Sequence, residues 1–162
     1  MKRKITSAIL AGLVFVMAAC SAAPATAVNN ANPAVEFSGA KLNLNTVTGD
    51  ELLATIPSFP SRMVREFQEY RPYVSIQQFR QEIGKYVDDT QVAEYEKYVY
   101  VPISINDSDS ETLQQIPGLD STEADSLISG RPYASTDAFL EKLSGFVSAD
   151  ELTIAKSYLG GN

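Results

Sequence analysis

The sequence contains no His and no Trp, and Cys20 is its only cysteine among 162 residues. Without His, neither a Ser-His nor a Cys-His nucleophile can form, and one Cys cannot build a multi-cysteine zinc site. An enzyme that uses only carboxylates remains as an alternative, but no spacing of Asp and Glu marks one. The sequence therefore predicts a non-catalytic protein without a metal or a cofactor.

The N-terminal segment has the features of an export signal. Lys2, Arg3 and Lys4 precede an apolar stretch over residues 5–19 that is too short to span a bilayer comfortably. The sequence "VMAAC" resembles the lipobox of bacterial lipoproteins, in which Cys20 is lipidated and anchors the mature chain to a membrane. The alternative is cleavage after Ala27, which would discard Cys20 and leave a secreted or periplasmic protein. The lipobox is favoured because the only Cys stands where such a signal requires it, and both alternatives place the protein outside the cytoplasm, facing the periplasm or the cell exterior.

Residues 20–40 consist mainly of Ala, Asn, Pro and Ser, with almost no charge and no hydrophobic periodicity. This composition predicts a flexible tether, which would hold a domain on the order of 25 Å from its anchor. The chain has 13 basic and 20 acidic residues, a net charge of −7, and loss of the three basic signal residues leaves −10. A strongly acidic exported chain is, as a whole, a poor partner for DNA or for anionic lipid headgroups.

The rest of the sequence contains two copies of one segment. Residues 50–98 align without a gap with residues 110–158, and 12 of the 49 positions are identical. This alignment places Leu53 opposite Leu113, and a one-residue gap before position 50 extends the match to "LNLNT" and "ISIND". An ungapped match of this length indicates an internal duplication.

Each copy is predicted to fold into four short helices, so that an all-α chain has one domain over residues 41–100 and a second over residues 101–159. Helix starts are marked by Ser or Thr followed three residues later by Glu or Gln, which satisfy free backbone N–H groups reciprocally: Thr48/Glu51, Ser75/Gln78, Ser108/Glu111 and Ser148/Glu151. Ser61 and Ser121 are predicted to cap the second helix of each copy, and Asp88 the fourth helix of the first. The segments "LNLN" and "ISIN" are too short to predict a sheet.

The second helix of each copy ends at an Arg-Pro-Tyr tripeptide, residues 71–73 and 131–133, because the residue before a proline is pushed out of the helical region. We expect a structural role for it, with the Arg beside the last carbonyls of its helix and the Tyr on the core. A tight hairpin connects the first two helices of each copy. Its central apolar residue, Phe59 or Leu119, is predicted to fill the gap between them.

The run "LNLNT…ELL…IP", a hairpin, and then Val64, Phe67 and Arg71 resembles the helix-hairpin-helix proteins, in particular the ComEA-like competence DNA receptors. The chain is also similar to the extrinsic photosystem II proteins of the PsbU type, in which the same fold serves protein contact. The second half of each copy looks like a degenerate second hairpin. The resemblance spans residues 42–159 and implies two tandem four-helix helix-hairpin-helix domains after the signal peptide and the tether.

In that family, a Gly-apolar-Gly hairpin offers backbone N–H groups at the start of a helix to a DNA phosphate. The first copy has Ser58 and Pro60 at the glycine positions, and Pro60 has no N–H to offer. The resemblance implies these possible phosphate contacts: Ser58, Phe59, Ser61, Arg62 and Arg65. The favoured alternative for Arg62 and Arg65, as for Arg80, is an ordinary solvated surface.

The second copy keeps Gly118 and Leu119 in a degenerate hairpin, but Asp120 stands at the second glycine position and two further acids follow within five residues. These carboxylates would repel a phosphate. Residues 103–162 carry three basic and ten acidic residues, whereas residues 41–101 carry seven and nine. DNA binding is therefore not expected of the second copy, and at most weakly of the first.

Two functions from different classes follow. The first is an exported, membrane-anchored, non-catalytic helix-hairpin-helix scaffold that contacts an unknown protein. The second is a ComEA-like receptor for double-stranded DNA that acts through the hairpin of the first copy only. Tyrosines near the end of that copy could form a patch for a partner, although core packing is the expectation for Tyr95 and Tyr98.

Overall fold

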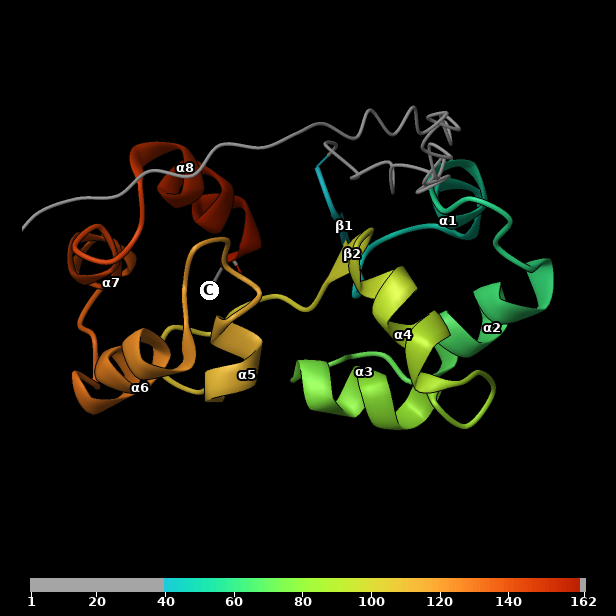
Figure 1. The fold of residues 1–162 in the computed structure, drawn as a ribbon, viewed down its shortest axis with the longest axis horizontal. Coiled ribbons are helices and arrows are strands. Elements are labelled where there is room, and N and C mark those ends of the chain that lie inside the picture. The colour runs from blue at the N-terminus through green and yellow to red at the C-terminus, as the bar shows by residue number, and fades with distance from the viewer. Residues whose placement is uncertain (1–39, 161–162) are drawn as a thin grey trace, which may run out of the picture. The chain divides into compact units, whose positions relative to one another are not determined.

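A computed structural model describes residues 40–160, which form eight helices and one short parallel sheet (Figure 1). The protein is therefore all-α in its main architecture, as the sequence predicts. The elements in chain order are β1 (Leu42–Asn43), α1 (Gly49–Thr55), α2 (Ser61–Glu69), α3 (Ile76–Ile83), α4 (Asp89–Glu96), β2 (Val99–Tyr100), α5 (Ser110–Leu113), α6 (Ser121–Ser129), α7 (Thr136–Leu143) and α8 (Ala149–Tyr158).

Most of the predicted helix caps are confirmed. Capping boxes start α1 and α8, and single side-chain caps start α3 and α4: Thr48 with Glu51, Ser148 with Glu151, Ser75 and Asp88. The prediction for α2 and α6 is wrong, because Ser61 and Ser121 are the first helical residues and the N-caps are Pro60 and Asp120. The residue before each serine has the extended backbone that an N-cap needs.

The predicted Ser108/Glu111 cap of α5 is also wrong. The N-cap is Asp109, whose carboxylate accepts a hydrogen bond from the backbone N–H of Thr112 at 2.7 Å. Ser108 is buried one residue earlier, where its hydroxyl accepts from the backbone N–H of Ser104 at 2.9 Å. The prediction is off by one residue, because serine and aspartate are both good N-caps and are adjacent in this segment.

In the structure, the one-residue gap between the copies lies within the first helix, after Leu52, and not before position 50 as in the sequence alignment. The N-caps Thr48 and Asp109 are equivalent, and so are Leu52 and Leu113, both of which have no exposed surface. Leu53, which the sequence alignment places opposite Leu113, is 43% exposed. Equivalent positions are thus 61 apart up to Leu52 and 60 apart from Ile56 onward, because three residues separate Leu52 from Ile56 and only two separate Leu113 from Ile116.

A short parallel ladder joins the beginning of the first copy to its end, contrary to the expectation of no sheet. Leu42 lies opposite Val99, and the backbone N–H of Leu42 donates to the carbonyl of Tyr98 at 2.8 Å. In the second copy, Ile103 and Leu159 form the equivalent bridge. Each segment is too short to predict a strand alone, but the helices bring both ends of the copy together and leave their backbone groups in reach of each other.

Each copy has its own hydrophobic core cluster. The first includes Phe59, Phe67 and Tyr95, whose rings pack edge to face with centroids 5.0–5.4 Å apart. The second cluster includes Leu119. The predicted plugs are confirmed, since Phe59 and Leu119 are both only 7% exposed.

The duplicated tyrosine of Arg-Pro-Tyr is held by an asparagine from the loop before the first helix. Asn45 accepts from the backbone N–H of Tyr73 at 2.8 Å and donates to its carbonyl at 2.9 Å. Asn106 and Tyr133 form the same pair in the second copy, at 2.8 and 3.1 Å. The clamp uses the side chain of the asparagine and only the backbone of the tyrosine, so it accounts for the recurrence of the asparagine.

The arginine of the same tripeptide reaches past its own helix. Arg71 donates to the carbonyl of Val47 at 2.6 Å, and Arg131 donates to the carbonyls of Ile105 and Ser108 at 3.0 and 2.6 Å. The expectation that it lies by the last carbonyls of its own helix is therefore wrong. It ties the second helix of each copy to the loop before the first, where orphan carbonyls are available.

Candidate binding surfaces

The hairpin of the first copy keeps a left-handed turn without a glycine. Ser58 has φ of +55°, a region that favours glycine, and Gly118 has φ of +79° at the equivalent position. Pro60 is the N-cap of α2 and supplies no side-chain cap. The first N–H groups of α2 are therefore not satisfied by a capping side chain.

The two arginines of this hairpin differ in their partners. Arg65 donates to Glu66 at 2.8 Å, and its side chain is 80% exposed whereas that of Glu66 is 7% exposed. The hydrogen bond from Arg65 lowers the pKa of Glu66 and raises that of Arg65. Arg62 is exposed and has no ion pair among the described residues. Of the two arginines beside the start of α2, Arg62 is therefore the more available to bind an external anion.

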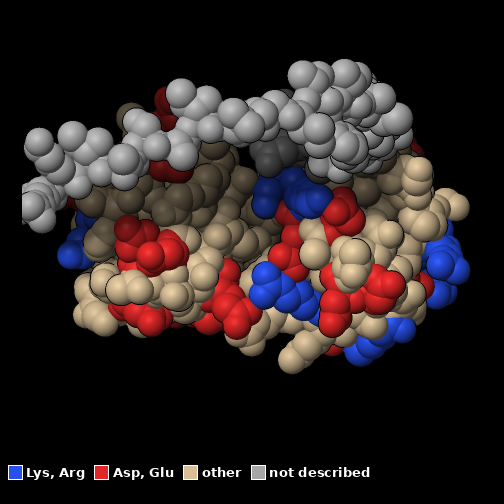
Figure 2. All heavy atoms as spheres, in the orientation of Figure 1, with Lys and Arg blue, Asp and Glu red and all other residues tan. Residues whose placement is uncertain are grey.

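The hairpin of the second copy is closed by its own carboxylates. Asp120 accepts from the backbone N–H of Glu123 at 2.9 Å, and Glu123 accepts from that of Asp120 at 3.1 Å. Gly118 lies so close to α8 that a Cβ there would be 2.5 Å from a carboxylate oxygen of Glu151. On the face drawn in Figure 2, acidic side chains lie over both copies while basic ones lie mostly over α1–α4. The start of α6 is thus already occupied by negative charge.

A second surface of the first copy, which we call the tyrosine surface, consists of Arg65, Tyr70, Lys85 and Tyr86. The hydroxyls of Tyr70 and Tyr86 are 2.8 Å apart, and the Lys85 ammonium lies 5.0 Å from the centroid of the Tyr70 ring. Tyr86 is 42% exposed, and its hydrogen bonds to Tyr70 and Glu66 raise its pKa. The surface presents two aromatic rings and two cations, Arg65 paired with Glu66 and Lys85 paired with Glu82.

The fold does not require the tyrosine surface, because the second copy lacks it. The residues at the four equivalent positions are Asp125, Gly130, Gly145 and Phe146. Phe146 is half-buried and packs on its core, whereas Tyr86 carries its hydroxyl to the exterior. A surface that one copy has and an equally folded copy lacks is a candidate for function.

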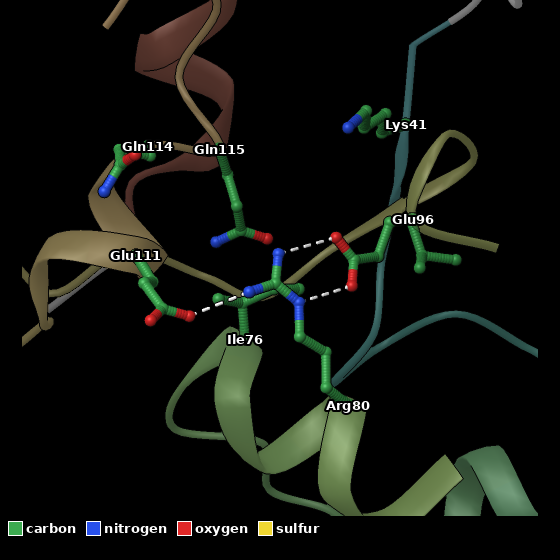
Figure 3. A pocket seen from close by; sticks show the side chains of 8 residues that line it. Lys41, Ile76, Arg80, Glu96, Glu111, Gln114 and Gln115 are labelled. Atoms are coloured by element: carbon green, nitrogen blue, oxygen red, sulfur yellow. Dashed lines mark hydrogen bonds and ion pairs between the residues drawn. The ribbon is translucent and has the colours of Figure 1, made fainter. Parts of the chain in front are cut away.

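A polar cavity of about 330 Å³ lies where α3 of the first copy meets α5 of the second (Figure 3). It is lined by the apolar Ile76 and Val99 and by charged and amide side chains. Arg80 donates to both carboxylate oxygens of Glu96, at 2.7 and 2.9 Å, and to Glu111 at 2.8 Å. Arg80 is therefore engaged by both copies and is not simply the solvated side chain that the sequence suggests.

Lys41 enters the same cavity from the residue before β1 (Figure 3). Burial lowers the pKa of Lys41, and the negative charge of Glu96 partly opposes this effect. The two cations and two carboxylates of the cavity balance in charge. Since Arg80 already contacts both acids, the cavity is a structural ion cluster in the described chain.

Uncharged contacts complete the junction. The backbone N–H of Ile76 donates to the hydroxyl of Thr112 at 3.0 Å, and both residues are buried. The amide of Gln115 accepts from the N–H of Val101 at 2.9 Å and donates to its carbonyl at 3.1 Å. Neither contact could be predicted from the sequence, because Thr112 and Gln115 belong to no local motif and bond to residues that are distant in the sequence.

Of the residues singled out in the sequence, Ser58, Ser61, Arg62 and Arg65 lie together at the first hairpin, whereas Phe59 is a core residue. Cys20, the signal and the tether lie outside the described residues. Within residues 40–160, no helix has both the length and the apolar character needed to cross a membrane, and no three metal-ligand side chains cluster.

Comparison of the chain with protein-family models, with curated proteins and with solved structures gave no match.

Proposed function

We propose that the protein is a non-catalytic helix-hairpin-helix binding module, exported and anchored to a membrane through Cys20, that contacts a protein partner. The observation that carries the proposal is the tyrosine surface, with its exposed Tyr86 beside Tyr70, Lys85 and Arg65. Tyrosine and arginine are enriched at the centres of protein interfaces, because they combine apolar area with hydrogen-bonding groups. The second copy would then support the first.

The test is photo-crosslinking in the native cell, with a benzophenone amino acid placed at Tyr86. We expect a protein adduct from this position, and none from the same probe at Phe146, the equivalent position of the second copy. Tyr86→Ala should abolish co-purification of the captured protein without changing the helical circular dichroism. Equal capture from both positions, or no protein capture at all, would refute a partner site on the tyrosine surface.

The anchor is tested separately. Metabolic labelling with a radioactive fatty acid should mark the wild-type protein and not Cys20→Ala. Labelling that is unchanged in Cys20→Ala would overturn the lipoprotein proposal, while an unlabelled wild type that is shortened to begin after Ala27 would support the alternative cleavage.

A specific observation supports a second function, binding of double-stranded DNA by the first hairpin. The start of α2 lacks a side-chain cap and lies beside Arg62 and Arg65, whereas Asp120 and Glu123 fill the equivalent place in the second copy. A phosphate placed there would meet free N–H groups and the positive end of the helix. The overall negative charge predicts that such binding is weak.

Retardation of duplex DNA at low salt tests this function. We expect binding to fall steeply as salt rises, because phosphate contacts release counterions. It should be lost in Arg62→Ala/Arg65→Ala and retained in Lys142→Ala, which removes a cation from the second copy. The absence of retardation by the wild type at low salt would exclude the DNA function.

A further inference from the structure

The junction between the copies joins two different surfaces of one repeated fold. The first copy contributes α3 and the end of α4, with Ile76, Arg80 and Glu96, and the second contributes α5, with Glu111 and Thr112. Because the copies are equivalent, α7 and α8 carry the counterpart of the first surface, and α1 carries the counterpart of the second. In residues 40–160 there is no third copy to cover either counterpart.

Exposure distinguishes the used surfaces from the unused ones. Ile76 is 1% exposed and Thr112 has no exposed surface, and a hydrogen bond joins the two residues across the junction. Their equivalents, Thr136 on α7 and Glu51 on α1, are both exposed. Residues 40–160 therefore present two open surfaces that correspond to the two sides of an existing contact.

The open surface on α7 and α8, which we call the α7–α8 face, consists of Thr136, Leu140 and Lys156. Leu140 stands at the position of Arg80, and Lys156 at that of Glu96. Leu140 is half-buried, whereas Lys156 is exposed and has no ion pair among the described residues. This face thus presents one apolar side chain and one unpaired cation.

The open surface on α1, which we call the α1 face, consists of Asp50, Glu51 and Leu53. Asp50 is the second residue of α1, as Glu111 is of α5. Counted from the same N-caps, Leu53 takes the place of Gln114, which lines the junction cavity. Asp50 has no ion pair among the described residues, and Leu53 is one of the few large apolar side chains exposed there, at 43%.

The two faces are complementary in the arrangement that the junction uses. Inside the chain, Arg80 bonds both Glu96 and Glu111, so these two carboxylates lie within reach of one guanidinium group. In the same arrangement between two chains, Leu140 would replace that arginine, and Lys156, at the position of Glu96, would lie within reach of Asp50, at the position of Glu111. Leu140 and Leu53 would take the places of Arg80 and Gln114, which both line the junction cavity. We propose that the chain self-associates head to tail, with the α7–α8 face of one copy docked on the α1 face of the next.

Such a contact is heterologous, since it joins different surfaces, and it leaves an open face at each end for a further copy. At the internal junction, Ile76 and Thr112 are buried and joined by a hydrogen bond. Thr136 and the charged Glu51 stand at these two positions in the proposed contact, so we expect it to be weaker than the internal junction. The ionic pair makes it sensitive to salt. This association is independent of the tyrosine surface and of the first hairpin.

Sedimentation equilibrium of the mature chain, residues 20–162 with Cys20→Ala, tests the proposal, because neither a lipid nor the apolar signal segment then drives association. At low salt, the weight-average mass should rise with protein concentration. Lys156→Glu and Asp50→Lys should each shift the midpoint to at least tenfold higher concentration, and the two together in one chain should restore it, because the exchanged charges again face each other. All of these positions are exposed, and circular dichroism checks that each variant is folded.

Lys142→Glu is the matched control, because it makes the same change of charge elsewhere on the second copy. It should leave the midpoint within about threefold of the wild type. A wild-type mass that stays monomeric at all concentrations overturns the proposal. So does a loss in Lys142→Glu as large as that in Lys156→Glu, or a charge exchange that fails to restore association.

Discussion

Thr112→Val tests whether the hydrogen bond across the junction stabilises the fold. The hydroxyl of Thr112 accepts from the backbone N–H of Ile76 at 3.0 Å in a buried site. Valine has nearly the same shape but no acceptor, so the variant leaves a buried N–H without a partner. The loss of one acceptor for a buried donor costs about 1–3 kcal/mol. We therefore expect the free energy of unfolding to fall by about 2 kcal/mol.

The assay is urea unfolding followed by far-ultraviolet circular dichroism, with the free energy obtained from the midpoint and the slope. Thr153→Val is the matched control, because the hydroxyl of Thr153 is exposed and donates only within its own helix, to the carbonyl of Ala149. This control should change stability by less than about 0.5 kcal/mol. Equal effects of the two substitutions, or a loss below about 0.5 kcal/mol for Thr112→Val, would refute a stabilising junction.

Three further predictions concern features of the individual copies. Asn45→Ala should lower the free energy of unfolding by about 1–3 kcal/mol, because two half-buried hydrogen bonds are lost. Asn106→Ala should lower it by less, because the equivalent pair of hydrogen bonds is exposed. Urea unfolding measures both effects. Gly118→Ala should destabilise by at least about 1–2 kcal/mol, because φ is positive there and the new Cβ would also displace the Glu151 carboxylate. Ser58→Ala should stay within about 0.5 kcal/mol, since a side chain is already accommodated at that position, and thermal unfolding compares the two variants. Hydrogen bonds from the N-cap lower the pKa of Glu51 in the folded state, so its stabilising effect is present above the ordinary glutamate pKa and is lost as pH falls through the folded value. Unfolding measured from pH 6 downward should therefore show a weaker dependence on pH in Glu51→Gln, and an unchanged dependence would contradict the assignment.

Local signals in the sequence predict the helices well, because a helix start depends on residues only three apart. The pair of Ser148 and Glu151 forms both of its bonds in the structure. The failures are local too: Asp109 and Asp120 compete with neighbouring serines, and pattern alone does not decide which residue takes the extended backbone. The burial of Phe59 could be predicted, because an apolar side chain in the middle of a tight hairpin lies between the two helices that the hairpin connects.

The surfaces that carry the proposals depend on distance in space rather than in sequence. Tyr70 and Tyr86 are 16 residues apart, and Arg80 meets Glu111 across 31. No periodicity links such pairs. The comparison of the copies did contain a signal, because Tyr86 and Arg80 are replaced by Phe146 and Leu140, and a change of polarity at an equivalent position shows that the fold accepts either residue.

The two hairpins satisfy the start of their second helix in opposite ways. In the second copy, Asp120 and Glu123 supply the hydrogen bonds and the negative charge that the N-terminus of α6 favours, so that helix needs no ligand. In the first copy, Pro60 has no side-chain acceptor and no charge, and within residues 40–160 its carbonyl accepts only from the N–H of Met63, at 2.8 Å. The N–H groups of Ser61 and Arg62 are thus left for water or for an anion from outside. Any anionic group that contacts a hairpin of this protein should therefore contact the first hairpin. The carboxylates of Asp120 and Glu123 should repel it from the second.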